Sequence, residues 1–89
     1  MKIVYLKSFS KDLDNIKYDR VRNNVIDLID NIKKANSLSD LKNVKKLSGS
    51  KIAYRIRLGD YRVGFFFENN TLELAKIQHR KDIYKNFPR

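Results

Sequence analysis

The first third of the chain passes from a short apolar run to residues spaced at a helical period. Residues 2 to 7 alternate weakly, which suits a short strand. Ser8 or Ser10 can cap the helix that follows, and Asp12 lies in its first turn. A second helix is predicted from Asp19 to about Ala35, because apolar residues recur there every three or four positions. The apolar positions are Phe9, Leu13 and Ile16 in the first helix, and Val21, Val25, Leu28, Ile29 and Ile32 in the second.

Beyond a polar connection at residues 36 to 50, the period changes to two. The connection contains a possible helical turn at Leu38 to Leu41 and ends in a turn at residues 47 to 50. Two strands then meet at the hairpin signal Gly59-Asp60, and a last strand runs from Thr71 to about Gln78. One face of the first two strands carries Ile52, Tyr54, Ile56, Leu58, Tyr61, Val63, Phe65 and Phe67; the other carries Lys51, Ala53, Arg55, Arg57, Arg62, Gly64, Phe66 and Glu68.

This order of elements predicts an α+β fold. An N-terminal strand and a helical hairpin precede a three-stranded antiparallel meander, and the four strands would form one sheet. The hairpin should cover one face of the sheet and leave the other open. Because 89 residues support only one core, we expect a single domain over residues 1 to 89. The residues expected to be buried are Val25, Leu28, Ile29, Tyr54, Ile56, Val63 and Phe65.

The composition narrows the class of protein. There is no cysteine, so neither a disulfide framework nor a thiolate metal site is expected. A single histidine and scattered carboxylates make no ligand cluster, and we expect no metal and no cofactor. The N-terminal apolar run is too short for a signal peptide, and no stretch approaches the roughly 18 apolar residues of a membrane span. We therefore expect a cytoplasmic protein.

The charge of the chain favours a polyanionic partner. Twenty Lys and Arg residues against ten Asp and Glu residues give a net charge of +10. Residues 38 to 58 hold six basic side chains and one acidic side chain, which is half of the excess. Many small proteins are basic only for solubility, but this concentration favours nucleic acid or a ribonucleoprotein.

Three arginines are predicted to share the open face of the sheet. Arg55 and Arg57 project to the same side of one strand, and Arg62 projects from the next strand across the hairpin. Guanidinium groups bind phosphate oxygens through two parallel hydrogen bonds. The alternative is an ordinary solvated polar face, although such faces usually mix Lys, Glu, Thr and Ser.

Four segments of the chain form a recognisable series. They are Lys46-Leu47-Ser48-Gly49, Tyr54-Arg55-Ile56-Arg57-Leu58, Gly59-Asp60-Tyr61-Arg62-Val63 and His79-Arg80-Lys81-Asp82-Ile83-Tyr84. In order and spacing they resemble the RelE/ParE superfamily of toxins from type II toxin–antitoxin systems. The resemblance covers essentially the whole chain and favours the RelE-like branch.

The resemblance implies a ribosome-dependent messenger RNA endoribonuclease, an mRNA interferase. In that branch the 2'-hydroxyl of the RNA attacks the adjacent phosphate in the ribosomal A site. The implied catalytic residues are Arg55, Arg57, Arg62, Arg80 and Tyr84. Arginine suits the charge of the phosphorane but is a poor base, and the RNA-cleaving pattern has lysines where this chain has Arg55 and Arg57. The general base stays open among Tyr84, His79, Lys51 or a neighbouring lysine, and an acid such as Glu68 or Asp82.

Two further sets of residues are predicted to bind partners. RNA phosphate is expected to contact Lys45, Lys46, Lys51, Lys76 and Lys81. In a regular last strand, His79 would point toward the helices, whereas Phe66, Leu72 and Leu74 would form an apolar patch on the open face. The resemblance implies that a cognate antitoxin binds such a patch. The alternative is that the C-terminal tail covers it through Ile83 and Phe87.

Three functions are compatible with these features. The first is the RelE-like nuclease, with the ribosome and messenger RNA as partners. The second is a ParE-like toxin that inhibits DNA gyrase without cutting anything, which the missing base favours. The third is a plain RNA-binding or structural module.

Overall fold

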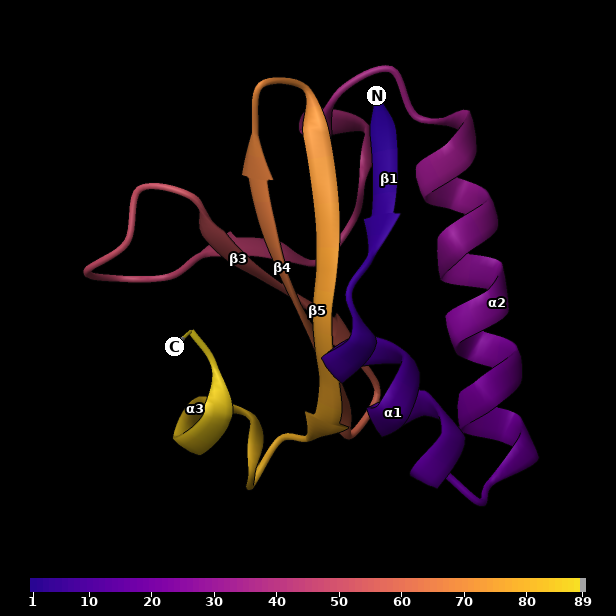
Figure 1. The fold of residues 1–89 in the computed structure, drawn as a ribbon. Coiled ribbons are helices and arrows are strands. Elements are labelled where there is room, and N and C mark those ends of the chain that lie inside the picture. The colour runs from indigo at the N-terminus through magenta and orange to yellow at the C-terminus, as the bar shows by residue number, and fades with distance from the viewer. Residues whose placement is uncertain (89) are drawn as a thin grey trace.

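The computed structural model describes residues 1 to 88, which form a sheet with helices on both of its faces (Figure 1). The strands are β1 (Lys2–Tyr5), β2 (Val44–Lys46), β3 (Ala53–Leu58), β4 (Tyr61–Glu68) and β5 (Thr71–His79). The helices are α1 (Lys7–Asn15), α2 (Asp19–Lys34) and α3 (Ile83–Asn86), and a 3-10 turn spans Leu38–Asp40. The predicted α+β order, the helical hairpin and the turn in the connection are confirmed.

The sheet has five strands in the order β1-β5-β4-β3-β2. β1 runs parallel to β5, and the other neighbours are antiparallel. The predicted count of four strands is therefore wrong by one, because residues 44 to 46 pair with β3. With three residues and one apolar side chain, β2 is too short to show a period of two.

The main core lies between the sheet and the two long helices. Val25, Leu28, Ile56, Val63 and Phe65 are buried there, as predicted. Ile29 and Tyr54, which were also expected to be buried, are only partly buried and pack against its rim. Arg55 and Arg57 lie on the face away from α2, because Ile56 between them points into the core.

The start of α1 differs from the predicted serine cap. Leu6 occupies the N-cap position, and no side chain caps the helix there. The Ser8 hydroxyl instead donates a hydrogen bond to the carbonyl oxygen of Ala75 in β5. Only Leu6 separates β1 from α1, so the first turn of the helix lies beside β5 and its Ser8 side chain bonds that strand.

A bulge in β5 reverses the predicted facing of two leucines. Gly64 pairs with Lys76 and Phe65 pairs with Leu74, so Ala75 has no partner on β4. Leu72 and Leu74, on the N-terminal side of the bulge, point into the main core and are 0% exposed. The prediction that they form an exposed patch is wrong, because it assumed regular alternation through Ala75.

The opposite face of the sheet carries a second, smaller core. Ile83 and Phe87 are buried there against Ala53 and Ala75. In Figure 1, α2 lies on the right of the sheet and α3 on its lower left. Among residues 1 to 88, no helix is both long and apolar enough to cross a membrane.

Candidate nucleic-acid interface

The register of the strands brings three predicted arginines and one lysine onto a single face. Arg57 lies directly opposite Arg62 in the β3–β4 pair, and Arg55 lies two residues earlier on the same side of β3. On the other side of β3, Lys45 lies directly opposite Arg55. We call Lys45, Arg55, Arg57 and Arg62 the basic face. Like charges opposite one another destabilise a strand pair, so an anion is the favourable occupant of this surface.

Backbone carbonyl groups orient two of these guanidinium groups. Arg62 Nη1 donates to the carbonyl oxygens of Gly59 at 2.7 Å and Tyr61 at 2.9 Å. Arg55 Nη1 donates to the carbonyl oxygen of Asn43 at 2.9 Å. Asn43 adopts a φ of 64°, a left-handed conformation that asparagine tolerates. The hairpin turn therefore holds Arg62 in place, and the residue before β2 holds Arg55.

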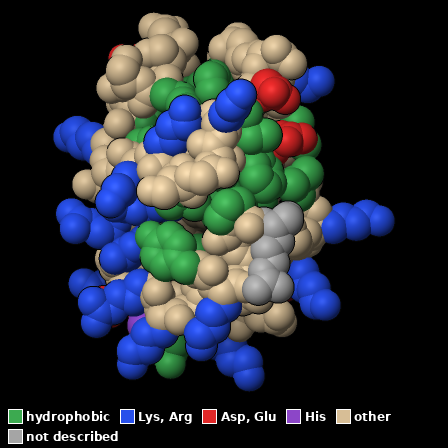
Figure 2. Space-filling view, turned by 90° about the vertical axis from the view of Figure 1, so that its left-hand side faces the viewer, with side chains coloured by type: hydrophobic (Ala, Val, Ile, Leu, Met, Phe, Trp, Pro, Cys, Tyr) green, Lys and Arg blue, Asp and Glu red, His purple; other side chains and the backbone are tan. Residues whose placement is uncertain are grey.

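The charge of the basic face is not compensated by carboxylates. Within residues 1 to 88, the ion pairs join Lys76 to Asp12 and Lys85 to Asp82. No arginine of the basic face takes part in either pair. Figure 2 shows the side of the molecule that carries α3: Lys and Arg side chains surround a central apolar area, and most of the acidic surface lies at the upper right.

The other two predicted catalytic residues come from the segment after β5. Arg80 is exposed, and its backbone N–H donates to the carbonyl oxygen of Asp60 at 2.8 Å, so the segment is tied to the hairpin turn beside Arg62. Tyr84 is 56% exposed and lies on α3. Their positions depend on the chain beyond β5 rather than on strand register.

The five predicted RNA-binding lysines fall into different environments. Lys45 belongs to the basic face, whereas Lys46 lies opposite Tyr54 and so points to the other side of β2. Lys51 and Lys81 are exposed, in the connection before β3 and just after β5. Lys76 is only 21% exposed at its side chain and is paired with Asp12 at 3.3 Å. Lys76 is therefore already engaged within the protein.

His79 has structural contacts at the end of β5. Its ring meets the Tyr61 ring edge-on, with the centroids 5.7 Å apart. Its Nδ1 accepts a hydrogen bond from the backbone N–H of Lys81 at 3.2 Å. No group of three or more potential metal ligands occurs in the described chain.

The C-terminal segment packs on Phe66, the one residue of the predicted apolar patch that lies on this face. The Phe66 and Phe87 rings lie 5.0 Å apart, and Phe66 is partly buried. Gly64 makes room for Phe87, because a Cβ atom at Gly64 would lie 2.6 Å from Phe87 Cδ2. Ile83 and Phe87 therefore cover part of Phe66, whereas antitoxin binding at Phe66 stays a prediction.

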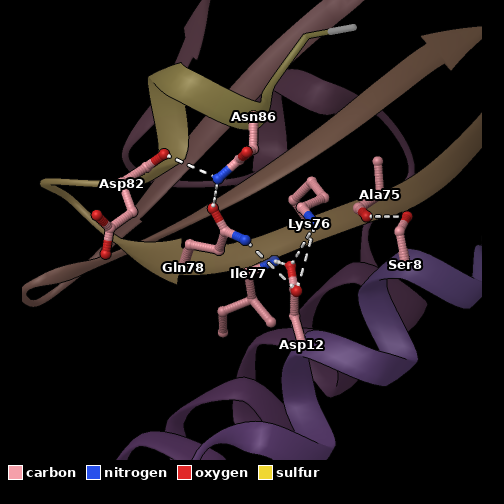
Figure 3. A network of polar contacts seen from close by, with 8 residues as sticks. All are labelled: Ser8, Asp12, Ala75, Lys76, Ile77, Gln78, Asp82 and Asn86. Carbon is pink, nitrogen blue, oxygen red and sulfur yellow. Dashed lines mark hydrogen bonds and ion pairs between the residues drawn. The ribbon is translucent and has the colours of Figure 1, made fainter.

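Sequence reasoning missed the residues that attach this segment. Asp12, Gln78 and Asn86 form a polar network between α1, β5 and α3 (Figure 3). Gly64 carried a signal, because a glycine inside a strand often marks the close approach of another group. The polar network carried no comparable signal, since its members are far apart along the chain.

Comparisons with known proteins give one consistent result. No family model matches the chain. It is 38% identical over 89 residues to Toxin RelE3 of Methanocaldococcus jannaschii, covering 99% of this chain and all of that protein. The toxin–antitoxin complex RelB-RelE from Methanococcus jannaschii contains a chain with a TM-score of 0.80 and 36% identity, covering 96% of this chain and 99% of that one. The archaeal RelE-RelB complex from Pyrococcus horikoshii OT3 shares the fold, with a TM-score of 0.69, 24% identity and coverage of 92% and 97%.

Proposed function

Because the chain belongs to the RelE family of toxins, we propose that it cuts messenger RNA on the ribosome and thereby inhibits translation. The supporting likeness extends over the full length of the RelE toxin it matches. The chain would be the toxin of a type II toxin–antitoxin pair. A protein that acts on translating ribosomes would work in the cytoplasm.

One observation carries this proposal: the basic face is uncompensated and built into the sheet. Arg57 and Arg62 face each other across two strands, and no carboxylate pairs with them in residues 1 to 88. A fixed cluster of guanidinium groups suits a phosphate whose charge rises during reaction. A surface that served only solubility would not need its cations on facing positions.

The proposed reaction is an internal transfer within the RNA. The 2'-oxygen forms a bond to the adjacent phosphorus, and the bond from phosphorus to the 5'-oxygen breaks. The 2'-hydroxyl gives up its proton to a base, and the leaving 5'-oxygen takes up a proton. The products are a 2',3'-cyclic phosphate and a 5'-hydroxyl end, with no oxidant, metal or cofactor required.

The chain offers different groups for these roles. We assign Arg62 and Arg80 to the charge of the transition state, and Arg55 and Arg57 to binding and orienting the phosphate. Tyr84 is the proposed proton-transfer group, because its side chain is exposed on α3 and α3 packs on the same face of the sheet as the arginines. His79 is less suitable, since it packs on Tyr61 and accepts a backbone N–H.

The second partner we propose is a cognate antitoxin. Two of the similar structures contain a RelE chain together with RelB. An acidic, amphipathic segment would suit the basic face and the adjoining apolar surface at Phe66. Leu72 and Leu74 are buried in the main core and no longer belong to this proposed contact.

Induction of the toxin in cells tests the proposed target. Pulse-labelling of new protein and new DNA should show a prompt loss of translation while replication continues at first. The matched control is Arg62→Ala, which should leave both syntheses intact. Loss of replication with intact translation would instead support inhibition of DNA gyrase, and the nuclease proposal would be wrong.

A further inference from the structure

We propose that a chain of hydrogen bonds running from α1 through β5 positions α3, and with it Tyr84, for RNA cleavage. The inference rests on the proposed function and assigns Asp12, Gln78 and Asn86 to positioning rather than to catalysis. Figure 3 shows these residues in one network between α1 and α3.

The network begins at the part of β5 that no longer pairs with β1. β1 pairs with β5 only as far as Leu74, and beyond that point α1 lies along the strand. Asp12 Oδ2 accepts a hydrogen bond from the backbone N–H of Ile77 at 3.0 Å and lies 3.3 Å from Lys76 Nζ. The Asp12 side chain is only 12% exposed. The Asp12 carboxylate thus accepts a backbone hydrogen bond from the unpaired edge of β5 and neutralises Lys76 on the same strand.

Gln78 carries the connection across β5 to α3. Its Nε2 lies 3.5 Å from Asp12 Oδ1, and its Oε1 accepts a hydrogen bond from Asn86 Nδ2 at 2.8 Å. Asn86 Nδ2 also donates to the carbonyl oxygen of Asp82 at 3.3 Å, just before α3. A flipped Gln78 amide would place oxygen against carboxylate and nitrogen against nitrogen, so its orientation is set from both ends.

The helix that receives this network cannot hold itself in place. α3 has four residues, and helices of that length are not stable alone. Ile83 and Phe87 anchor it through apolar contacts, which have little directional preference. The Asn86–Gln78 hydrogen bond is directional and fixes the rotation of the helix. Tyr84 lies between Ile83 and Asn86 in the same turn, so its place follows from these two attachments.

The same network also reaches the basic face. Lys76 and Arg55 flank Gly64 on its two neighbouring strands, and Gln78 lies opposite Arg62. Asp12 therefore contacts Lys76, which lies in line with Arg55 across the strands, and Gln78, which lies in line with Arg62. This arrangement ties the position of α3 to the arginines through one strand.

Three substitutions test the network, and the chain supplies a matched control. Gln78→Leu removes the central amide, Asn86→Ala removes the attachment on α3, and Asp12→Asn removes the charge at the origin. Asp14→Asn is the control, because Asp14 is an exposed aspartate on the same helix and belongs to neither ion pair nor side-chain hydrogen bond of the described chain.

Two measurements on the full-length protein show whether α3 is positioned for cleavage. Amide hydrogen exchange at residues 83 to 87 should accelerate by about 5- to 30-fold in Gln78→Leu and Asn86→Ala, as for the loss of one or two hydrogen bonds. Single-turnover cleavage on programmed ribosomes at saturating toxin should slow by about 10- to 100-fold in all three network variants. The apparent affinity for the ribosome should stay within about 2-fold, because all four cations of the basic face are retained. Asp14→Asn should change none of these.

The outcomes separate this inference from the proposed function. Faster exchange at α3 together with a slower saturated rate supports positioning. If the wild-type protein cleaves and Gln78→Leu cleaves at the same saturated rate, the inference is wrong, whatever happens to exchange. If the wild-type protein does not cleave at all, the proposed function fails, and unchanged exchange in the variants would then also overturn the attachment of α3.

Discussion

The two faces of the sheet are built in opposite ways. The face under α1 and α2 packs against a continuous apolar core, in which Val25, Ile32 and Phe65 are completely buried. The other face combines a small apolar cluster, in which Ile83 and Phe87 pack on Ala53 and Ala75, with cations that no carboxylate pairs among residues 1 to 88. Stability is concentrated on the first face. The cations of the second face have no carboxylate partners among residues 1 to 88, which leaves a surface on which an anion can bind.

Leu74→Asp should have the largest effect on stability, because it places a charge in the core under α1 and α2. Leu74 is 0% exposed in the main core, so the substitution would bury an unpaired charge. We expect the free energy of unfolding to fall by more than about 4 kcal/mol, enough to unfold a marginally stable domain. Urea denaturation measures this loss. Leu74→Ala, with an expected loss of about 2 to 5 kcal/mol, gives the part that is due to lost packing alone. A folded Leu74→Asp protein that had lost only antitoxin binding would show that Leu74 is exposed after all.

Arg62→Ala and Arg80→Ala should separate function from stability on the second face. Each should raise the barrier to cleavage by about 2.5 to 4 kcal/mol, or two to three decades in rate, as for the loss of one preorganised donor. The free energy of unfolding should change by less than about 1 kcal/mol, because neither side chain packs in the core. Single-turnover rates at saturating toxin measure the first effect. Normal saturated rates in both variants would make the arginines a binding surface only.

Gly64→Ala should show how the small core is held. Its new Cβ would meet the Phe87 ring, so we expect overpacking of about 1 to 3 kcal/mol and displacement of α3. In a Phe87→Ala background the clash is gone, and Gly64→Ala should become neutral or slightly stabilising. A double-mutant cycle by urea denaturation gives the coupling. Additive effects of the two substitutions would mean that Phe87 does not occupy this position in solution.

The smallest effect is expected from Lys45→Ala, which removes one edge cation of the basic face. Loss of one phosphate contact should lower the salt slope of single-stranded RNA binding by about 0.7. Lys46→Ala is the matched control, because Lys46 points to the other side of β2. Fluorescence anisotropy over a salt series measures both slopes. Equal slopes for the two variants would place the RNA elsewhere.

The sequence predicted the first two strands of the meander well because their alternation is regular. It placed Arg55, Arg57 and Arg62 on the face away from the helical hairpin, where the structure has them. Parity failed in β5, since the bulge at Ala75 leaves apolar residues at both even and odd positions, Leu72 and Leu74 before it and Ile77 after it. One extra residue was enough to exchange the faces of Leu72 and Leu74.

The parts of the candidate site that depend on distant contacts were not predictable from local pattern. α3 is too short for a helical period, and it is placed by Phe87 over Gly64 and by Asn86 on Gln78. Ser8 looked like a helix cap because serine is common there, but in the structure its hydroxyl bonds Ala75. Such contacts join residues more than 60 positions apart in the case of Ser8 and Ala75.

The most direct test of the central claim is the chemistry of the cut ends. Purified toxin would be added to ribosomes programmed with a defined messenger RNA, and the RNA fragments would be analysed by mass spectrometry. Transfer to the adjacent 2'-oxygen predicts 2',3'-cyclic phosphate and 5'-hydroxyl ends, and no cleavage with Arg62→Ala over the same interval. Intact RNA at saturating wild-type toxin, or fragments with 5'-phosphate ends, would contradict the account.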